Sequence, residues 1–235
     1  MSTLTMASIT QYKQIERLMI AVDCIIFGFD GERLKALFVK RNFEPEKGRW
    51  SLMGGFVKKD ESVNDAAGRI LEQLTGLHNI YMEQLSCFGE VKRDPGGRVV
   101  SVAYYALINI SDYPKELMEE HHTKWFSIDA IPALVFDHRE MVNMAKQKLQ
   151  EKCSTHPVGF VLLPDKFTMQ KLQNLYEAIF ESKFDKRNFI KKILSLNILR
   201  KLAEKDKLSS KKGSFYYVFD EQNYKKLEKE GVKFI

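Results

Sequence analysis

A chain of 235 residues is long enough for one large domain or two modest ones. Its 44% hydrophobic residues support packed cores, and its 29% charged residues of both signs indicate a soluble protein. No stretch approaches the roughly 18 apolar residues of a membrane span, and the N-terminus lacks the basic patch and apolar run of a signal peptide. We therefore expect a cytoplasmic protein with no membrane partner.

The net charge of +6 is unevenly distributed along the chain. Residues 151–235 hold 18 Lys and Arg against 11 Asp and Glu, a net charge of +7, so residues 1–150 carry a net charge of −1. A basic module that binds a polyanion fits this asymmetry. A solvated, lysine-rich surface fits it equally well, so charge does not decide between the two.

The first two thirds of the chain are predicted to mix strands and helices. Residues 18–30 and 34–42 are rich in branched apolar side chains and are joined by a turn at Asp30 and Gly31, which predicts a β-hairpin. The remaining predicted elements are a helix over 63–75, strands over 79–91, 98–110 and 122–129, and a helix over 137–152. Helices set between hairpin strands predict an α+β domain and argue against a parallel doubly wound sheet.

The composition changes after Lys152, where residues 153–164 contain two prolines and are predicted to form a connector. Two helices follow, one capped by Thr168 and the other by Asp185, with a short turn over 181–184 between them. The last predicted elements are strands over 198–204 and 215–220 and a helix over 221–230. A helix, a turn, a helix and a hairpin in this order predict a winged helix-turn-helix.

Residues 54–76, GGFVKKDESVNDAAGRILEQLTG, resemble the Nudix box, G-x5-E-x7-R-E-U-x-E-E-x-G-U, in which U is a bulky aliphatic residue. The residues in register with the motif are Gly55, Glu61, Arg69, Leu71, Gly76 and Leu77. Glu61 is expected to position Arg69 through a salt bridge. Ile70, Gln73 and Leu74 occupy the positions of the three glutamates in the second half of the motif.

The replaced glutamates bear on catalysis. Divalent cations such as Mg²⁺ need several oxygen ligands on one face of this helix. The three replacements supply no carboxylate, and Glu72 lies about a quarter-turn from their line. We therefore predict no bound metal, no cofactor and no hydrolysis, so that the protein is not an enzyme. The alternative is an active hydrolase whose metal ligands come from elsewhere, for example from Asp60, Glu61 and Glu90.

The resemblance extends over nearly the whole chain. From about Ile20 to Lys152 the chain is similar to Nudix proteins, and GEVKRDPGGRVVSVAYYALI is similar to the ADP-ribose type. Residues 162–194 resemble the winged helix of the Nudix-related transcriptional regulators, and the chain most resembles their arabinose-responsive branch, typical of Bacteroides-like bacteria. The resemblance implies an N-terminal extension over 1–17, a ligand-sensing Nudix-like α/β/α sandwich over 18–153 and a winged helix-turn-helix DNA-binding domain over 154–235.

The rear helices carry the candidate DNA contacts. Residues 183–212 hold 11 basic and 3 acidic residues, and the second helix is predicted to be the recognition helix. Its predicted buried face is Phe189, Ile193 and Leu194. The candidate DNA-binding residues are Lys171, Tyr176, Lys186, Arg187, Asn188, Lys191, Lys192, Lys211 and Lys212. Arginine suits guanine and asparagine suits adenine. A lysine-rich helix on a protein-interaction module is the alternative.

The candidate ligand contacts lie where Nudix folds hold substrate, over the sheet between the glycine-rich loop and the box. They are Asp23, Lys40, Arg41, Trp50, Glu90, Arg93, Asp94 and Tyr104. Asp23 lies in an apolar strand, where a lone carboxylate is costly unless it is paired or faces a ligand. Trp50 is equally compatible with core packing, and Arg93 and Asp94 with shaping the turn before Pro95.

Two functions from different classes follow from these features. The favoured function, which the resemblance implies, is a homodimeric transcriptional regulator that binds an inverted-repeat operator in double-stranded DNA and responds to a small-molecule effector, a sugar such as L-arabinose. Repression is the working assumption, with activation left open by the sequence. The alternative function is an active Nudix hydrolase of ADP-ribose or a related nucleotide, with a nucleic-acid-binding tail.

Overall fold

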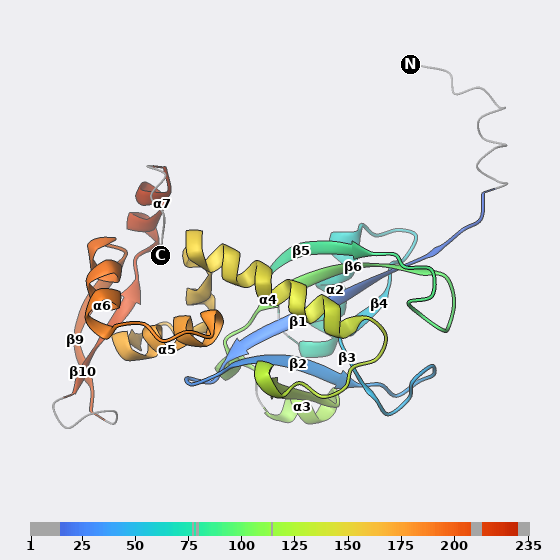
Figure 1. Ribbon diagram of the computed structural model, residues 1–235, viewed down its shortest axis with the longest axis horizontal. Helices are drawn as coiled ribbons and strands as arrows, with labels where there is room; N and C mark the ends of the chain where they lie inside the picture. The colour runs from blue at the N-terminus through green and yellow to red at the C-terminus, as the bar shows by residue number, and fades with distance from the viewer. Residues whose placement is uncertain (1–14, 77, 79, 114, 208–212, 230–235) are drawn as a thin grey trace, which may run out of the picture.

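The computed structural model describes residues 15–229 except 77, 79, 114 and 208–212 (Figure 1). Three predicted site or motif residues, Leu77, Lys211 and Lys212, therefore lie outside the described residues, as does most of the predicted extension. No helix in the described ranges is long and apolar enough to cross a membrane.

Strand β1 (Met19–Phe29) is the centre of the seven-stranded sheet. Its near-continuous apolar sequence, MIAVDCIIFGF, is typical of a strand covered on both faces. It runs parallel to β6 from Met19 to Phe27, and antiparallel to β4 in its first half and to β2 in its second half. The other strands are β2 (Leu34–Lys40), β3 (Trp50–Ser51), β4 (Met53–Phe56), β5 (Tyr81–Phe88), β6 (Val99–Leu107) and β7 (Thr123–Ser127).

Helices cover both faces of this sheet, with α4 (His138–Thr155) in front and α2 (Val63–Thr75) behind (Figure 1). Successive side chains of a strand point to opposite faces. Val22, Cys24 and Ile26 accordingly pack in the core under α2, whereas Ile25, Phe27 and Phe29 pack in the core under α4. Asp23 shares the odd parity of the second set and therefore faces the α4 side.

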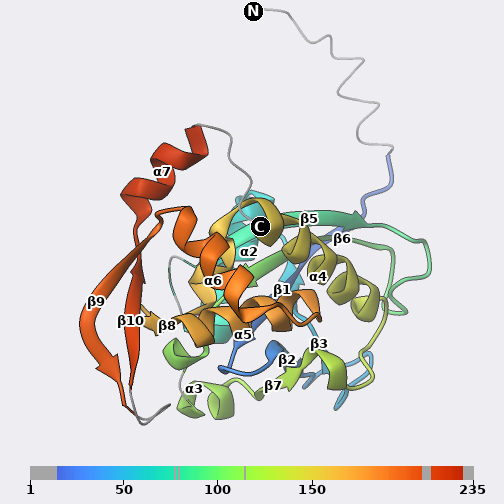
Figure 2. The ribbon, with the colours of Figure 1, turned by 60° about the vertical axis from the view of Figure 1, so that its left-hand side comes forward.

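The rear of the chain is a winged helix, seen side-on in Figure 2. Its elements are β8 (Phe167–Thr168), α5 (Met169–Phe180), α6 (Lys186–Ser195), β9 (Leu199–Asp206), β10 (Ser214–Phe219) and α7 (Glu221–Lys229). The three strands pair in the order β8-β10-β9. Both predicted N-caps are confirmed: Thr168 accepts from the backbone N–H of Lys171, and Asp185 from that of Asn188.

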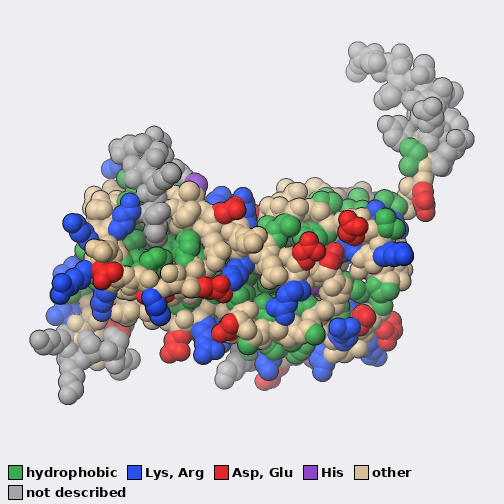
Figure 3. All heavy atoms as spheres, in the orientation of Figure 1, with side chains coloured by type: hydrophobic (Ala, Val, Ile, Leu, Met, Phe, Trp, Pro, Cys, Tyr) green, Lys and Arg blue, Asp and Glu red, His purple; other side chains and the backbone are tan. Residues whose placement is uncertain are grey.

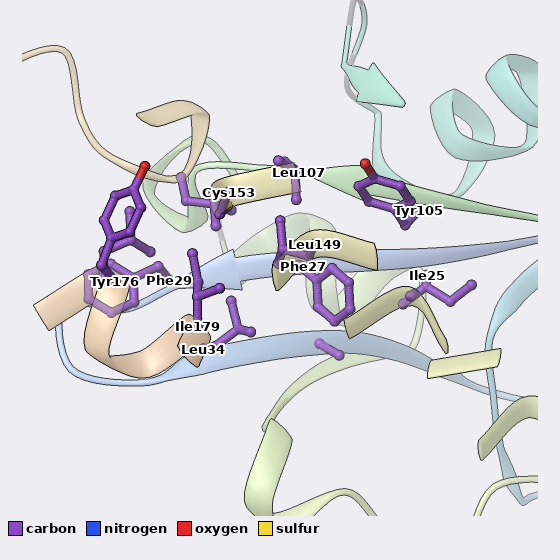
Figure 4. Close-up of a cluster of buried hydrophobic side chains, with 14 of the residues drawn as sticks. Ile25, Phe27, Phe29, Leu34, Tyr105, Leu107, Leu149, Cys153, Tyr176 and Ile179 are labelled. Carbon is purple, nitrogen blue, oxygen red and sulfur yellow. The ribbon is translucent and has the colours of Figure 1, made fainter. Parts of the chain in front are cut away.

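One apolar core joins the sandwich to the winged helix (Figure 4). Tyr176 and Ile179 of α5 belong to the same buried cluster as Phe29 of β1 and Leu149 of α4. Polar contacts line the same junction: Gln150 Nε2 donates to the Ile179 carbonyl at 2.8 Å, and Asn174 Nδ2 donates to the Gly31 carbonyl at 3.3 Å. Helix α5 is thus bound to the sandwich both at helix α4, through Gln150, and at the turn after β1, through Asn174.

The predicted fold class, an α+β protein with an α/β/α sandwich followed by a winged helix, is confirmed. Short elements were not predicted: β3, β4, β8, α3 (Lys115–Glu120) and the 3₁₀ helices η1 (Ile110–Asp112), η2 (Ile128–Ala130) and η3 (Pro157–Leu162). The buried face of α6 was predicted correctly at Phe189 and Ile193, but Leu194 is 46% exposed. Leu194 follows Ile193 by one residue and so lies about 100° around the helix, away from the core.

Candidate ligand pocket and DNA-binding surface

A cavity of about 200 Å³ opens between the sheet, the loop after β2 and the start of α4. Five of the predicted ligand residues line it together: Asp23, Lys40, Arg41, Arg93 and Asp94. They come from β1, from the end of β2 and from the loop between β5 and β6, which are distant in sequence. Gly54, the aromatic residues Phe43, Phe56 and Phe136, and His138 complete its wall.

Asp23 is buried in this wall, with 7% of its surface exposed. Its Oδ2 accepts a 2.6 Å hydrogen bond from Ser101 Oγ and lies 3.7 Å from Arg93 Nη2. Its Oδ1 lies 3.7 Å from His138 Nε2. The backbone of Gly54 passes directly beneath, so that a Cβ at Gly54 would lie 2.2 Å from Oδ1. The carboxylate is therefore paired on one side and faces the pocket with the other.

Arg93 ties the β5–β6 loop to helix α4. It donates two hydrogen bonds to Asp137, from Nε to Oδ2 at 2.8 Å and from Nη2 to Oδ1 at 2.7 Å. Burial opposes the charge of Arg93, but the hydrogen bonds and charge of Asp137, with the charge of Asp23, hold its pKa above the usual value. One buried guanidinium thus serves two carboxylates, and the cluster keeps an excess negative charge.

His138 is a pocket residue that the sequence reasoning missed. Its ring is 3% exposed, and its Nδ1 accepts the backbone N–H of Leu52 at 3.1 Å. Burial lowers the pKa of His138 below its usual value, although Asp23 and Asp137 act in the opposite direction. The ring is therefore neutral at pH 7 and carries its proton on Nε2. The only sequence signal is its place in the first turn of a predicted helix.

Arg41 is held at the pocket wall by three contacts. Its Nε donates to the Pro45 carbonyl at 2.9 Å, and its guanidinium carbon lies 4.2 Å from the ring centre of Phe43 and 5.3 Å from that of Phe136. Among the described residues, neither terminal nitrogen of Arg41 has a hydrogen bond. A fixed guanidinium with two free nitrogens is suited to binding phosphate oxygens in pairs.

Trp50, Glu90 and Tyr104 do not line this pocket, which corrects their predicted placement. Trp50 packs edge-on against Phe126, with ring centres 4.9 Å apart. Tyr104 pairs with Cys24 in the sheet and so points to the α2 face, where its hydroxyl donates to Asn64. Glu90 is exposed and lines a separate depression, to which Arg93 also contributes.

Helix α2 keeps the frame of the Nudix box. Arg69 donates to Glu61 at 2.6 and 2.8 Å, as predicted, and also to the Phe56 carbonyl at 3.2 Å. Hydrogen bonds from Arg69 and from the backbone of Lys58 lower the pKa of Glu61 from 4.5 to about 2. Glu61 thus locks the loop to the helix.

The positions of the missing glutamates carry no carboxylate toward the pocket. Ile70 is buried, Gln73 is exposed and Leu74 lies at the pocket edge. Glu72 is exposed and pairs with His78. Within the described ranges, no group of three or more His, Cys, Asp or Glu side chains is arranged to hold a metal ion.

Helix α6 presents the basic surface. Its exposed residues include Lys186, Arg187, Asn188, Lys191 and Lys192. In Figure 3, Lys and Arg side chains gather at the left-hand end, over the winged helix. The neighbouring strand β9 and the residue after it add Arg200, Lys201, Lys205 and Lys207, all exposed and absent from the predicted set. The Nζ atoms of Lys201 and Lys205 lie 3.7 and 4.4 Å from the ring centre of Phe215.

Two residues predicted to bind DNA are placed elsewhere. Tyr176 is completely buried, and its ring stacks on Phe180, so it belongs to the core. Lys171 is half-buried and lies against the turn at Gly31 in the front sheet. Tyr176 and Lys171 lie about 140° apart around α5, and each is taken up by a contact other than DNA: Tyr176 by the core, and Lys171 by the turn of the front sheet.

Residues 17–145 match the NUDIX domain family, and residues 159–219 match the NrtR DNA-binding winged helix domain. The chain is 31% identical over 210 residues to the "ADPR responsive transcriptional repressor NtrR" of Acinetobacter baylyi, covering 88% of this chain and 84% of that protein. The chain belongs to the Nudix and winged-helix family of NrtR.

Other members and relatives of this family match different shares of the chain. Shewanella oneidensis NrtR, in a crystal structure with a 27mer DNA, has a TM-score of 0.78 and 26% identity, covering 92% of this chain and 97% of that chain. The "ADP-ribose pyrophosphatase" of Methanocaldococcus jannaschii is 32% identical over 123 residues, covering 52% of this chain and 70% of that protein. The predicted likeness to arabinose regulators is not supported. The names of the Acinetobacter and Methanocaldococcus relatives refer to ADP-ribose and not to a sugar such as arabinose.

Proposed function

We propose that this protein is a transcriptional repressor that binds operator DNA through α6 and responds to ADP-ribose bound in the cavity lined by Asp23 and Arg41. The observation that carries the proposal is this cavity, where fixed basic groups and a buried carboxylate cluster lie side by side. The repressor of Acinetobacter baylyi is named for the same response, which supports the choice of ADP-ribose over a sugar.

The chemistry of ADP-ribose fits the two sides of the cavity. Its diphosphate is suited to Arg41 and Lys40, since a guanidinium pairs with two phosphate oxygens and an ammonium neutralises a third. Its ribose hydroxyls are suited to carboxylates such as Asp23, which accept hydrogen bonds. The exposed rings of Phe43 and Phe56, 58% and 56% exposed, offer flat apolar surface to an adenine.

DNA binding is supported by the exposed side chains of α6. We propose that Arg187 and Asn188 contact base edges and that Lys191 and Lys192 contact phosphates. A homodimer on an inverted repeat is part of the proposal, because two-fold symmetric operators match two-fold symmetric proteins. Such a repressor works in the cytoplasm with the DNA that it regulates.

The test is a gel-shift titration on the promoters adjacent to the gene, followed by release with ligand. We expect a specific complex at moderate salt that dissociates as ADP-ribose is added, with no effect of L-arabinose at the same concentration. A specific complex that does not dissociate when ADP-ribose is added would refute ADP-ribose as the effector. The absence of a specific complex on any of these promoters would refute the repressor.

We further propose that ADP-ribose is bound without hydrolysis, because Ile70, Gln73 and Leu74 replace the glutamates of the box. The likeness to an ADP-ribose pyrophosphatase makes hydrolysis the second candidate function. Incubation of ADP-ribose with the protein and either Mg²⁺ or Mn²⁺ separates the two. Binding without release of AMP is expected, whereas metal-dependent turnover would establish the hydrolase.

A further inference from the structure

We propose that His138 and Asp23 together recognise a single hydroxyl group of the nucleotide ligand, which makes His138 a specificity-determining residue of the pocket. This inference rests on the proposed binding of ADP-ribose. It assigns the recognition of the ligand's sugar to two side chains that lie 115 residues apart in the sequence and meet at the inner wall of the cavity.

The imidazole of His138 is fixed in one orientation. Its Nδ1 accepts the backbone N–H of Leu52, so the ring cannot flip without leaving that buried N–H unpaired, which is costly. The proton is therefore on Nε2, and Nε2 is the atom that lies nearest to Asp23. The protein backbone, through Leu52, presents a single neutral N–H donor at the pocket wall.

The distance between this donor and Asp23 leaves room for a third group. Nε2 and Oδ1 are 3.7 Å apart, which is longer than a direct hydrogen bond. Among the described residues neither Nε2 of His138 nor Oδ1 of Asp23 forms a hydrogen bond. The hydrogen bond that Asp23 accepts from Ser101 is at its other oxygen, Oδ2. A donor and an acceptor thus face one place from which both are within hydrogen-bonding reach.

A hydroxyl group satisfies both atoms at once. Its oxygen accepts from Nε2–H, and its own proton is donated to Oδ1. A phosphate oxygen would meet the excess negative charge that Asp23 and Asp137 keep beside the single Arg93. A carbonyl oxygen would accept from His138 but leave Oδ1 unsatisfied. The pair therefore selects the sugar of the ligand, while Arg41 remains available to the diphosphate.

Two substitutions at His138 separate its structural bond from its ligand bond. In His138→Asn the amide can place its oxygen near the former Nδ1, which preserves the bond from Leu52 and removes the donor at Nε2. In His138→Gln the amide nitrogen can reach the former Nε2, which preserves the donor and gives up the bond from Leu52. A merely structural histidine would be harmed more by the second substitution.

Isothermal titration calorimetry with four ligands tests the inference on the full chain. The ligands are ADP-ribose, its 2′-deoxy and 3′-deoxy adenosine analogues, and ADP, which lacks the terminal ribose. Together the three analogues remove every hydroxyl of ADP-ribose. We expect His138→Asn to bind ADP-ribose roughly tenfold more weakly than the wild type, and to match the wild type for the analogue that lacks the recognised hydroxyl. His138→Gln should keep the wild-type ranking of the four ligands.

Equal weakening of all four ligands by His138→Asn, or no weakening, would overturn the inference, since either result removes the link to one hydroxyl. Failure of the proposed function gives a different pattern. A wild-type protein that binds none of the four ligands refutes ADP-ribose as the effector, and this inference with it. If the wild type binds the ligands but His138→Asn weakens all of them equally or none of them, only the role of His138 is refuted.

Discussion

Gly54 and Asp23 occupy adjoining space in the pocket wall, and this proximity dictates the residue type. A Cβ at position 54 would lie 2.2 Å from Oδ1 and 2.8 Å from the Val22 carbonyl, so the carboxylate would have to move. We expect Gly54→Ala to weaken ADP-ribose binding by roughly tenfold, the loss of about one hydrogen-bonded group. Calorimetric titration of the folded variant measures the change.

Gly68 offers a matched control from the same domain. A Cβ there meets nothing within 4 Å, and the residue lies inside helix α2. Gly68→Ala should leave ligand affinity unchanged and stabilise the fold by about 0.5–1 kcal/mol, because alanine is the better helix former. If Gly54→Ala binds ADP-ribose as tightly as Gly68→Ala, the placement of Asp23 is irrelevant to the ligand.

The sequence predicts the role of a single residue where its side chain would be energetically costly in the predicted element unless it had a partner or a ligand. Asp23 stands out as a carboxylate in an apolar strand, and the structure places it in the pocket wall. Tyr104 could not be excluded from the pocket on sequence alone, because the face to which its side chain points depends on the strand register. A shift of one residue would turn it to the other face of the sheet. His138 has its backbone partner 86 residues away at Leu52, an interaction that no local pattern reveals.

At the scale of elements, helix α2 is coupled to the preceding loop through Glu61 and Arg69. The folded-state pKa of Glu61 is about 2 and its usual value is 4.5, so its ionised form stabilises the fold above about pH 4.5. That contribution is lost as the pH falls from 4.5 toward 2. We expect Glu61→Gln to lower the Tm at pH 7, and the gap from the wild type to narrow as the pH falls below 4.5.

Thermal melts between pH 7 and pH 3 follow this gap. The control is Arg69→Gln, which removes the partner of the same ion pair. In that background Glu61→Gln should change the Tm less than it does in the wild type, because the backbone hydrogen bond from Lys58 remains but the partner of the ion pair is gone. If the Tm difference between the wild type and Glu61→Gln stayed constant down to pH 3, the stabilising role of ionised Glu61 would be contradicted.

Helix α6 buries Phe189 and Ile193 and exposes its basic side chains, Lys191 and Lys192 among them. We expect the double variant Lys191→Ala and Lys192→Ala to weaken DNA binding. The slope of log K against log salt should decrease by roughly 0.9 for each DNA phosphate that the variant no longer neutralises. Fluorescence anisotropy across a salt series measures both quantities. Lys59→Ala, an exposed lysine of the front domain, should retain the wild-type slope.

Whole elements could be predicted where their ends carry chemical signals. Helix α2 runs over the predicted residues because Ser62 and Asp65 form a capping box and Gly76 ends the helix at φ 68°. Strands β3 and β8 have two residues each, too few to show alternation, and they exist because longer strands pair with them. The burial of Tyr176 against the sandwich could not be predicted either, since helical spacing shows which residues share a face but not what that face packs against.

At the scale of the whole molecule, the apolar core spans both halves, so they are expected to unfold together. Both tryptophans, Trp50 and Trp125, lie in the front domain, whereas Ile179 belongs to α5. Ile179→Ala removes buried carbon atoms and should cost about 2–5 kcal/mol. We expect it to lower the melting temperature reported by tryptophan fluorescence, although the substitution is in the rear domain.

A tryptophan melt that stays at the wild-type temperature in Ile179→Ala would mean that the halves unfold independently. Calorimetry provides a second criterion, since a single cooperative transition has equal calorimetric and van't Hoff enthalpies. Lys59→Ala serves again as the surface control, and its melt should match that of the wild type.

The shared core also restricts how such proteins can diversify. A winged helix fused to a different sensor domain would leave Tyr176 and Ile179 without the apolar partners that β1 and α4 supply. Recombination at the connector, in evolution or in the design of biosensors, would therefore have to carry α4 together with the DNA-binding part. New effector preferences are expected to come from point substitutions at pocket positions such as Arg41 and His138, and less readily from exchange of domains.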